Sequence, residues 1–471
     1  MKPWHWDLDT TIAALHSRQI SSVELTRVMM SRIDKYDAGL SAYIWVNREQ
    51  AEHDAQEIDE ARSKGTPLSP LAGIPICVKD LFDISLMPST YGGLHFQHHI
   101  PKHTATAVRR LLQAGSIVLG KTNLHEYAYG TTTENPHFGS ARNPWNRGKV
   151  SGGSSGGTSV AITSGLASAG LGTDTGGSIR IPSALTGHVG LKPTYGLVSK
   201  YGVFPLASSL DHVGPMGKTV RDVALLLDAM AGYDPKDEGS ARFPQNSYLP
   251  TVVDSDRPLL GVRFGVPRQF FYEKCHVNVL QVVSHALHEL ERAGAVMVEV
   301  DIPLIQEVPQ NQNIIISSEA LNVHRALLQN KALYGEDVRR RLDAGREFTG
   351  ADLVSGYRFQ RRFQSALRSV FNQPVDVLVT PTTPLTATDI GQFKAHIKAQ
   401  EVNVRAHLTR YTNPWNLSGL PAISLPCGLA VDGLPVGLQL VGPAFSEQKL
   451  LQIAAQAESV LPWTPIAPEY R

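Results

Sequence analysis

A lysine and two serine-containing loops are the residues of this sequence best suited to chemistry. Lys79 follows the apolar run 74–78, which places its amine at the end of a buried strand, where burial disfavours the ammonium form and lowers the pKa. Residues 151–157 place two serines among glycines, and residues 172–180 place Ser178 behind two more. A neutral amine near a serine hydroxyl is a base and nucleophile for acyl transfer. The plainer alternative for Lys79 is a surface lysine or one paired with Asp80.

Two further patterns suggest other chemistry. Residues 115–122 match the phosphate-loop pattern G-x-x-x-x-G-K-[ST], but residues 117–119 favour a strand over the flexible loop that a phosphate needs. Residues 153–157 match the nucleophile elbow G-x-S-x-G around Ser155, which leaves an alternative mechanism open. That mechanism needs a downstream histidine, and the candidates are His212, His276, His324 and His407.

The elements that must position these residues alternate between helix and strand. A capping box at Ser21 to Glu24 opens a helix, and further helices are expected over 47–63 and 105–114 and near Ser446. The expected strands cover residues 71–78, 116–119 and 375–379, together with a hairpin over 422–429 and 436–441. Repeated alternation of this kind predicts a sheet covered by helices.

We therefore expect an α/β fold with one large domain over 1–471, in which helices cover both faces of a central mixed β-sheet. A helical layer is expected over 1–65, a core that carries the serine loops over 66–230, and a mostly helical cover over 231–371. Residues 372–471 should add strands and a helix that complete the sheet. Both halves supply strands and no Pro/Ser/Gly-rich linker separates them, which favours one domain over two.

The segment around the serine loops has an unusual composition. Residues 148–190 hold 12 of the 40 glycines, and the only charged residues between Ser151 and Leu191 are Asp174 and Arg180. A segment with so few charges is expected to be buried, where its backbone N–H groups need partners. We expect Asp174 and Arg180 to hold the loop through polar contacts.

Composition excludes several classes of function. The 471 residues carry 44 Lys plus Arg against 43 Asp plus Glu, a net charge of +1, so direct binding of nucleic acid is not expected. The three cysteines are far apart and odd in number, which indicates a reducing compartment. No signal-like N-terminus or long apolar run is visible, which predicts a cytoplasmic protein without a membrane span. The histidines at 95, 98, 99 and 103 lack ligand partners at metal spacing, and we predict no metal site.

Three ordered motifs closely resemble the amidase signature family, whose members hydrolyse carboxamides with a Ser, cis-Ser, Lys triad. They are the stretches 73–80, 152–157 and 174–182, with Lys79, Ser154 and Ser178 at the matching positions. Weaker similarity extends over nearly the whole chain, through 120–126 and 416–421. The family carries a Gly-Lys-Thr-Asn run without binding nucleotide, which accounts for the false phosphate loop.

The resemblance implies a role for each residue. Ser178 would attack the amide carbonyl, Ser154 would pass the proton after a cis peptide bond, and Lys79 would be the base. Backbone N–H groups from Thr175 through Ser178 would form the oxyanion hole; these residues are Thr175, Gly176, Gly177 and Ser178. Ser155 should support the loop and, with Gly130 and Thr131, is a candidate for substrate contact. Further candidates for lining the pocket lie in 127–133 and 356–371 and at Trp415.

The resemblance also implies a function. We expect an amidohydrolase that cleaves the C–N bond of a small linear carboxamide, or of a urea or carbamate derivative, without a cofactor. The alternative is the amidase subunit of a glutamine-dependent aminoacyl-tRNA amidotransferase. Residues 408–414 lack the acid that we would expect there to hold the amino group of glutamine, and Arg410 lies beside the place. A silent scaffold is less favoured because all three triad residues are present; a homodimer is compatible with the sequence.

Overall fold

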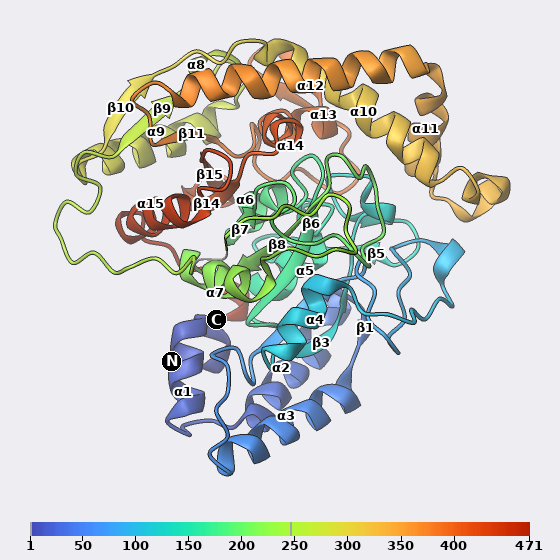
Figure 1. Ribbon diagram of the computed structural model, residues 1–471, viewed down its shortest axis with the longest axis vertical. Coiled ribbons are helices and arrows are strands. Elements are labelled where there is room, and N and C mark those ends of the chain that lie inside the picture. Colours follow the sequence, from blue (N-terminus) through green and yellow to red (C-terminus); the bar gives the residue numbers. More distant parts are fainter. Residues whose placement is uncertain (1, 245–246) are drawn as a thin grey trace.

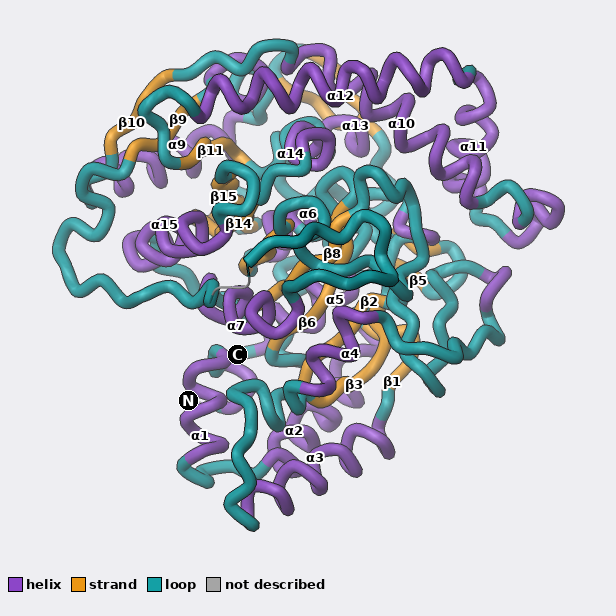
Figure 2. Tube along the Cα trace, in the orientation of Figure 1, coloured by secondary structure: helices purple, strands orange, loops and turns teal. Residues whose placement is uncertain are grey.

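An eleven-stranded mixed sheet runs through the middle of the molecule (Figure 2). The computed structural model describes residues 2–244 and 247–471. In order across the sheet, the strands are β1 (Tyr43–Val46), β3 (Ile117–Thr122), β2 (Pro75–Lys79), β6 (Ala169–Asp174), β8 (His212–Gly217), β7 (Val189–Lys192), β14 (Ala422–Leu429), β15 (Pro435–Val441), β11 (Val377–Pro381), β9 (Arg263–Val266) and β10 (Val296–Glu299). Strand β2 pairs in parallel with β3 and β6, and β9 in parallel with β10 and β11, whereas the other pairs are antiparallel.

Helices cover both faces of this sheet, as the alternation of elements predicted. Neighbouring residues of a strand point to opposite faces, and on β8 Met216 packs against Ile162 of α5 while Gly217 faces Asp222 of α7. The helices that surround the sheet are α1 (Leu8–His16), α2 (Ser22–Tyr36), α3 (Arg48–Ser63), α4 (Thr106–Gln113), α5 (Gly156–Thr163), α6 (Arg180–Thr186), α7 (Val220–Met230), α8 (Arg268–Phe271), α9 (Val277–Arg292) and α15 (Glu447–Val460).

A cover of helices lies over one end of the sheet, where α12 crosses the top of the view in Figure 1 with α10 and α11 beside it. α10 packs on α11, α12 and α14. The elements of this cover are α10 (Val308–Val323), α11 (Glu336–Ala344), α12 (Gly350–Phe371), α13 (Val404–Leu408), α14 (Asn413–Ser418) and the two-stranded hairpin of β12 (Lys394–Ile397) and β13 (Gln400–Asn403). A second small pair consists of β4 (Glu134–Asn135) and β5 (Gly139–Ser140), and Thr133 just before it contacts Gly153 and Gly156.

Several elements lie where local signals placed them, but three strands lie where helices, or mostly helices, were expected. The Ser21 side chain caps α2 with Glu24 in a capping box, and the C-terminal hairpin forms as β14 and β15. β1 lies within the N-terminal helical layer and pairs with β3. β9 and β10 lie in the range 231–371, which was predicted to be mostly helical, and they extend the sheet at its other edge. These strands are four residues each, too short for periodicity to separate them from loops.

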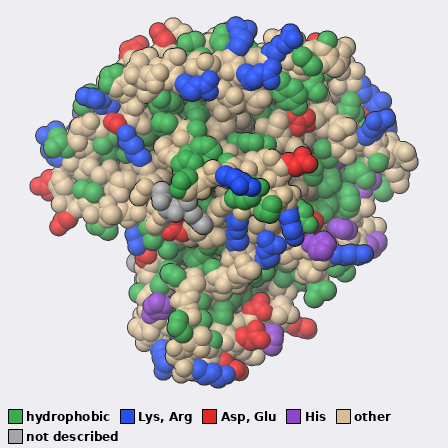
Figure 3. All heavy atoms as spheres, in the orientation of Figure 1, with side chains coloured by type: hydrophobic (Ala, Val, Ile, Leu, Met, Phe, Trp, Pro, Cys, Tyr) green, Lys and Arg blue, Asp and Glu red, His purple; other side chains and the backbone are tan. Residues whose placement is uncertain are grey.

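Charges of both signs lie on the surface, whereas the cysteines lie inside. Positive and negative side chains both occur across the face shown in Figure 3. The three cysteines are buried as free thiols. Within the ranges that the structure describes, no helix has the length and apolar character needed to cross a membrane.

The parallel strands β2, β3 and β6 place Lys79 and the residues that follow β6 at the same end of the sheet. Their carboxyl ends lie together because they run in the same direction. Val78 pairs with Leu171, so Lys79 at the end of β2 lies beside the last residues of β6. The residues 117–119 are part of β3, so the match to a phosphate loop is a strand, as expected.

Candidate active site

Lys79 is fully buried and directed at two hydroxyls. Its Nζ lies 2.8 Å from Ser154 Oγ and 2.7 Å from Thr173 Oγ1, and the side chain has no exposed surface. Burial lowers the pKa of this amine from 10.5 to about 7, against the attraction of nearby carboxylates. Asp80 pairs with Lys121 at 2.7 Å, so the plainer readings of Lys79, a surface lysine or a partner of Asp80, are wrong.

The loop before α5 presents Ser154 to this amine. The peptide bond between Gly153 and Ser154 is cis, as the family resemblance implied. A Cβ on Gly153 would lie 2.7 Å from Thr133 Oγ1 and 2.8 Å from Thr133 N, so the packing requires glycine here. The loop also contacts the third predicted residue, because the N–H of Ser155 donates to the carbonyl of Ser178 at 3.2 Å. Lys79 therefore contacts Ser154 directly, and the backbone of Ser178 is bonded to the same loop.

The turn that carries Ser178 is wrapped around the carboxylate of Asp174. Asp174 accepts from the N–H groups of Gly177 at 2.8 Å and Ile179 at 3.1 Å, and forms an ion pair with Arg180. Burial alone would raise the pKa of Asp174, but the charge and hydrogen bonds of Arg180 hold it well below its usual range. Arg180 also donates to Asn416 Oδ1 and Gln439 Oε1. This confirms that the two charged residues hold the loop.

The oxyanion hole predicted from this turn needs one correction. Gly177 donates its N–H to Asp174 Oδ1, so it does not face a substrate carbonyl. The carboxylate draws this donor inward because a buried anion needs hydrogen bonds. The N–H groups of Thr175, Gly176 and Ser178 have no acceptor among the described residues, which leaves three of the four predicted donors available.

Ser155 does not act as the nucleophile elbow would require. Its Oγ donates to the carbonyl of Thr173 at 3.2 Å, and none of the described histidines contacts this hydroxyl. His212, which pairs with Asp174 between β8 and β6, contacts the carbonyls of Leu210 and Asp174 through Nδ1. Ser155 therefore supports the loop, as expected, whereas its contact with a substrate stays a prediction.

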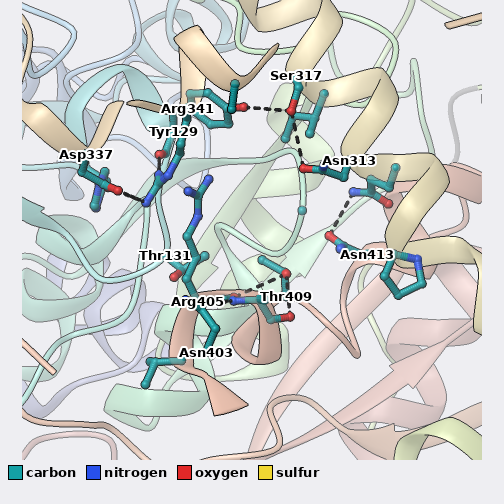
Figure 4. A pocket seen from close by; sticks show the side chains of 18 of the residues that line it. Tyr129, Thr131, Asn313, Ser317, Asp337, Arg341, Asn403, Arg405, Thr409 and Asn413 are labelled. Carbon is teal, nitrogen blue, oxygen red and sulfur yellow. Dashed lines mark hydrogen bonds and ion pairs between the residues drawn. The ribbon is translucent and has the colours of Figure 1, made fainter. Parts of the chain in front are cut away.

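A cavity of about 820 Å³ opens beside the turn, with Gly176 in its wall (Figure 4). Thr131 lines it as predicted, but Gly130 does not, because it packs against the ring of His125. Of the other predicted regions, Tyr129 and Thr132 reach the cavity, whereas α12 and Trp415 do not. Trp415 is buried and stacks on Phe271. The volume suits a small organic substrate.

Several polar residues of this cavity were missed from the sequence. They lie on α10, α11 and the segment after the β12–β13 hairpin, and they include Gln312, Asn313, Asp337, Arg341, Arg405 and Thr409. Arg341 lies in a run of three arginines on α11, a pattern typical of a solvated helix face. Nothing in the composition indicates that Arg341, rather than its two neighbours, lines the cavity.

The described residues contain no group of three or more His, Cys, Asp or Glu side chains placed to hold a metal ion. The histidines at positions 95, 98, 99 and 103 accordingly do not form a cluster of that kind. His95 instead contacts Tyr127 Oη through Nδ1 at 2.8 Å and the carbonyls of Leu327 and Asn330 through Nε2. Its contacts join the loop after β2 to the cover.

Comparisons with known proteins agree over almost the whole chain. The family model described as Amidase matches residues 24–451. A glutamyl-tRNA(Gln) amidotransferase subunit of Pseudomonas syringae pv. syringae is 39% identical over 479 residues, which cover 97% of each chain. A solved structure from a vestigial protein complex that reveals the evolutionary origins of an s-triazine catabolic enzyme has a TM-score of 0.91 at 31% identity, covering 96% of this chain and 98% of that one. The peptide amidase of Stenotrophomonas maltophilia has a TM-score of 0.83 at 29% identity, covering 98% of both.

Proposed function

Because this chain belongs to the amidase family, the amidase signature hydrolases, we propose that it cleaves a linear amide through an ester on Ser178. The observation that carries the proposal is the contact of the buried Lys79 amine with Ser154 Oγ at 2.8 Å. A lysine with a pKa of about 7 is partly neutral at physiological pH, and a neutral amine can accept a proton.

The proposed steps use Lys79, Ser154 and Ser178 in turn. Lys79 takes the proton of Ser154, and Ser154 takes that of Ser178, whose Oγ forms a bond to the carbonyl carbon. The N–H groups of Thr175, Gly176 and Ser178 stabilise the developing oxyanion. The proton returns through Ser154 to the nitrogen as the C–N bond breaks. A water molecule then gives its proton to Lys79 through Ser154 and attacks the ester, and Ser178 leaves as the hydroxyl. The products are a carboxylic acid and ammonia or an amine.

A serine-directed phosphonate tests this proposal. Treatment of the pure protein, followed by peptide mass mapping, should locate the added mass on Ser178, and Lys79→Ala should slow the labelling strongly. Modification of Ser155 would favour the elbow mechanism. An unmodified protein would favour a silent scaffold that keeps the fold.

A second candidate is the glutaminase subunit of an aminoacyl-tRNA amidotransferase. The curated relatives favour it, since glutamyl-tRNA(Gln) amidotransferase subunits match at 38% and 39% identity over nearly the full length of both chains. In that case the substrate is glutamine, the ammonia passes to a partner protein, and the chain works in a complex. Thr409 and Arg410 are the residues that argue the other way, because no acid of the stretch 408–414 is available for the amino group of glutamine.

Ammonia release separates the two candidates. A free-standing hydrolase should act on short aliphatic amides, aryl amides, ureas or carbamates at rates above those for glutamine. A glutaminase subunit should release ammonia from glutamine preferentially and should pass it to misacylated tRNA when the remaining subunits of the same organism are added.

A further inference from the structure

Two arginines reach the cavity beside the catalytic turn, and they differ in what they bind. Both guanidinium carbons lie within 5.5 Å of the ring centre of Tyr129. Arg341 forms an ion pair with Asp337 and donates to the carbonyl of Tyr129. The guanidinium of Arg405 lies over the Tyr129 ring and forms no ion pair and no hydrogen bond with any described residue. Figure 4 shows its side chain directed from α13 into the cavity.

We infer that Arg405 binds a carboxylate of the substrate, so that the enzyme cleaves the amide of a compound that also carries a free carboxylate. A half-buried cation without a partner in a cavity needs a counter-ion, and the planar fork of arginine matches a carboxylate in two hydrogen bonds. Gly176, whose N–H belongs to the proposed oxyanion hole, lies in the wall of the same cavity. This inference rests on the proposed function and names the substrate class.

The carboxylates of the cavity do not replace that ligand. Asp337 is held by Arg341 and by His125 Nε2 at 3.0 Å. Glu134 accepts from the N–H of Gly391, and Glu347 is exposed at the rim. None of the three forms an ion pair with Arg405.

The charged side chains of the cavity also indicate whether the substrate carries an ammonium group. An ammonium group beside the bound carboxylate would need an anion next to Arg405, and Thr409, which follows α13 and lines the cavity, has no charge. A carboxylate without a neighbouring ammonium therefore fits better than an amino acid. The ω-monoamide of a small dicarboxylic acid has this chemistry.

Three amides of the same length test the inference. Glutaramate carries the carboxylate, pentanamide lacks it, and glutamine adds an ammonium beside it. For the wild-type protein, kcat/KM should be roughly ten- to a hundredfold higher for glutaramate than for pentanamide, the range expected when a charged hydrogen bond is lost. Glutamine should fall below glutaramate.

Arg405→Gln should remove the preference for glutaramate, because it should lower kcat/KM for glutaramate far more than for pentanamide. Arg405→Lys should restore part of the preference, since it keeps the charge but loses the fork. Arg346→Gln is the matched control: it removes the same charge from an exposed arginine near the cavity that does not line it, and the preference should stay. Circular dichroism and the melting temperature establish that each variant is folded.

A second measurement keeps the inference testable if none of the three amides is hydrolysed. Glutarate should slow the labelling of Ser178 by a neutral phosphonate in the wild-type protein and should not do so in Arg405→Gln. Equal turnover of pentanamide and glutaramate, a preference that survives Arg405→Gln, or labelling that glutarate does not slow would overturn the carboxylate assignment while Ser178 still reacts. A preference for glutamine over glutaramate would overturn the exclusion of an ammonium and support the glutaminase. Failure of Ser178 to react at all would overturn the proposed function itself.

Discussion

The catalytic loops and the walls of the neighbouring cavity are built in different ways. Residues 151–157 and 174–180 are buried throughout, and hydrogen bonds of the Asp174 carboxylate and of the Ser155 N–H hold the two stretches in place. The cavity walls come from segments spread between residues 125 and 413, and several of their side chains, such as Asn313 and Phe393, are exposed. A substitution in the loops disturbs many contacts at once, whereas one in the walls changes mainly what the cavity binds. We therefore expect the loops to determine the reaction and the walls to determine which amide is bound.

The largest difference between the two regions should appear in turnover. Ser178→Ala and Lys79→Ala should each lower kcat at least about a thousandfold, since they remove the nucleophile and the base. The release of ammonia or amine from a substrate that the wild-type protein hydrolyses measures this.

Ser155→Ala is the matched control for these variants, because it removes a hydroxyl from the same loop. Ser155 Oγ bonds only to the backbone of Thr173, a contact worth about 1 kcal/mol, so most activity should remain. A loss as large as that of Ser178→Ala would show that Ser155 is the nucleophile.

The buried ion pair of Asp174 and Arg180 should contribute more to the free energy of unfolding than an ion pair at the surface. Asp174→Asn leaves the guanidinium of Arg180 buried without its counter-charge, and breaking a buried pair in this way costs about 3 to 5 kcal/mol. The free energy of unfolding in urea should fall by that amount, and the turn that presents Ser178 should lose its order.

A surface pair in the cover provides the comparison. Lys331 and Asp343 lie 2.9 Å apart with both side chains largely accessible to water, so Asp343→Asn should cost no more than about 1 kcal/mol. Similar losses for Asp174→Asn and Asp343→Asn would contradict the view that the loops depend on the buried network.

The sequence predicted the loops well for a physical reason. Glycine clusters, the lone Asp174 and Arg180, and the apolar run before Lys79 each reflect a local constraint that one stretch of chain must satisfy. The strand end at Lys79 and the role of Asp174 match these expectations, and the cis bond before Ser154 matches what the family resemblance implied. The engagement of Gly177 by Asp174 was missed, because the direction of one N–H depends on the geometry of the turn.

The cavity could not be predicted in the same way. Arg341 and Arg405 come from two elements of the cover that meet only in the fold, and neither has neighbours in sequence that mark it. The short strands β1, β9 and β10 were missed for a related reason, since pairing across the sheet rather than local pattern makes them strands. Long-range packing determines both the lining of the cavity and the pairing of these strands.

The pH dependence of the reaction should report on the base inside the loops. Because burial lowers the pKa of Lys79 to about 7 and the reactive form is neutral, kcat/KM should rise about tenfold per pH unit below pH 7 and level off above it. The profile should be measured with a substrate that does not titrate in this range.

Thr173→Val identifies the titrating group. Thr173 Oγ1 lies 2.7 Å from Lys79 Nζ and accepts from the ammonium form, so its loss disfavours that form and should move the midpoint of the profile to lower pH. An unchanged midpoint, or one that moves upward, would assign the profile to another group.

The smallest effects should come from the rim of the cavity. Phe393 is 72% exposed at the start of the β12–β13 hairpin and lines the cavity, so Phe393→Ala should change the free energy of unfolding by less than about 0.5 kcal/mol. It should alter KM a few-fold and leave kcat near the wild-type value, since an apolar contact far from the reacting atoms binds the ground state and the transition state alike. Steady-state kinetics on two amides of different size would measure the split. A fall in kcat comparable to that of the loop variants would mean that the hairpin positions the reacting groups, and the separation between fixed loops and adjustable walls would no longer hold.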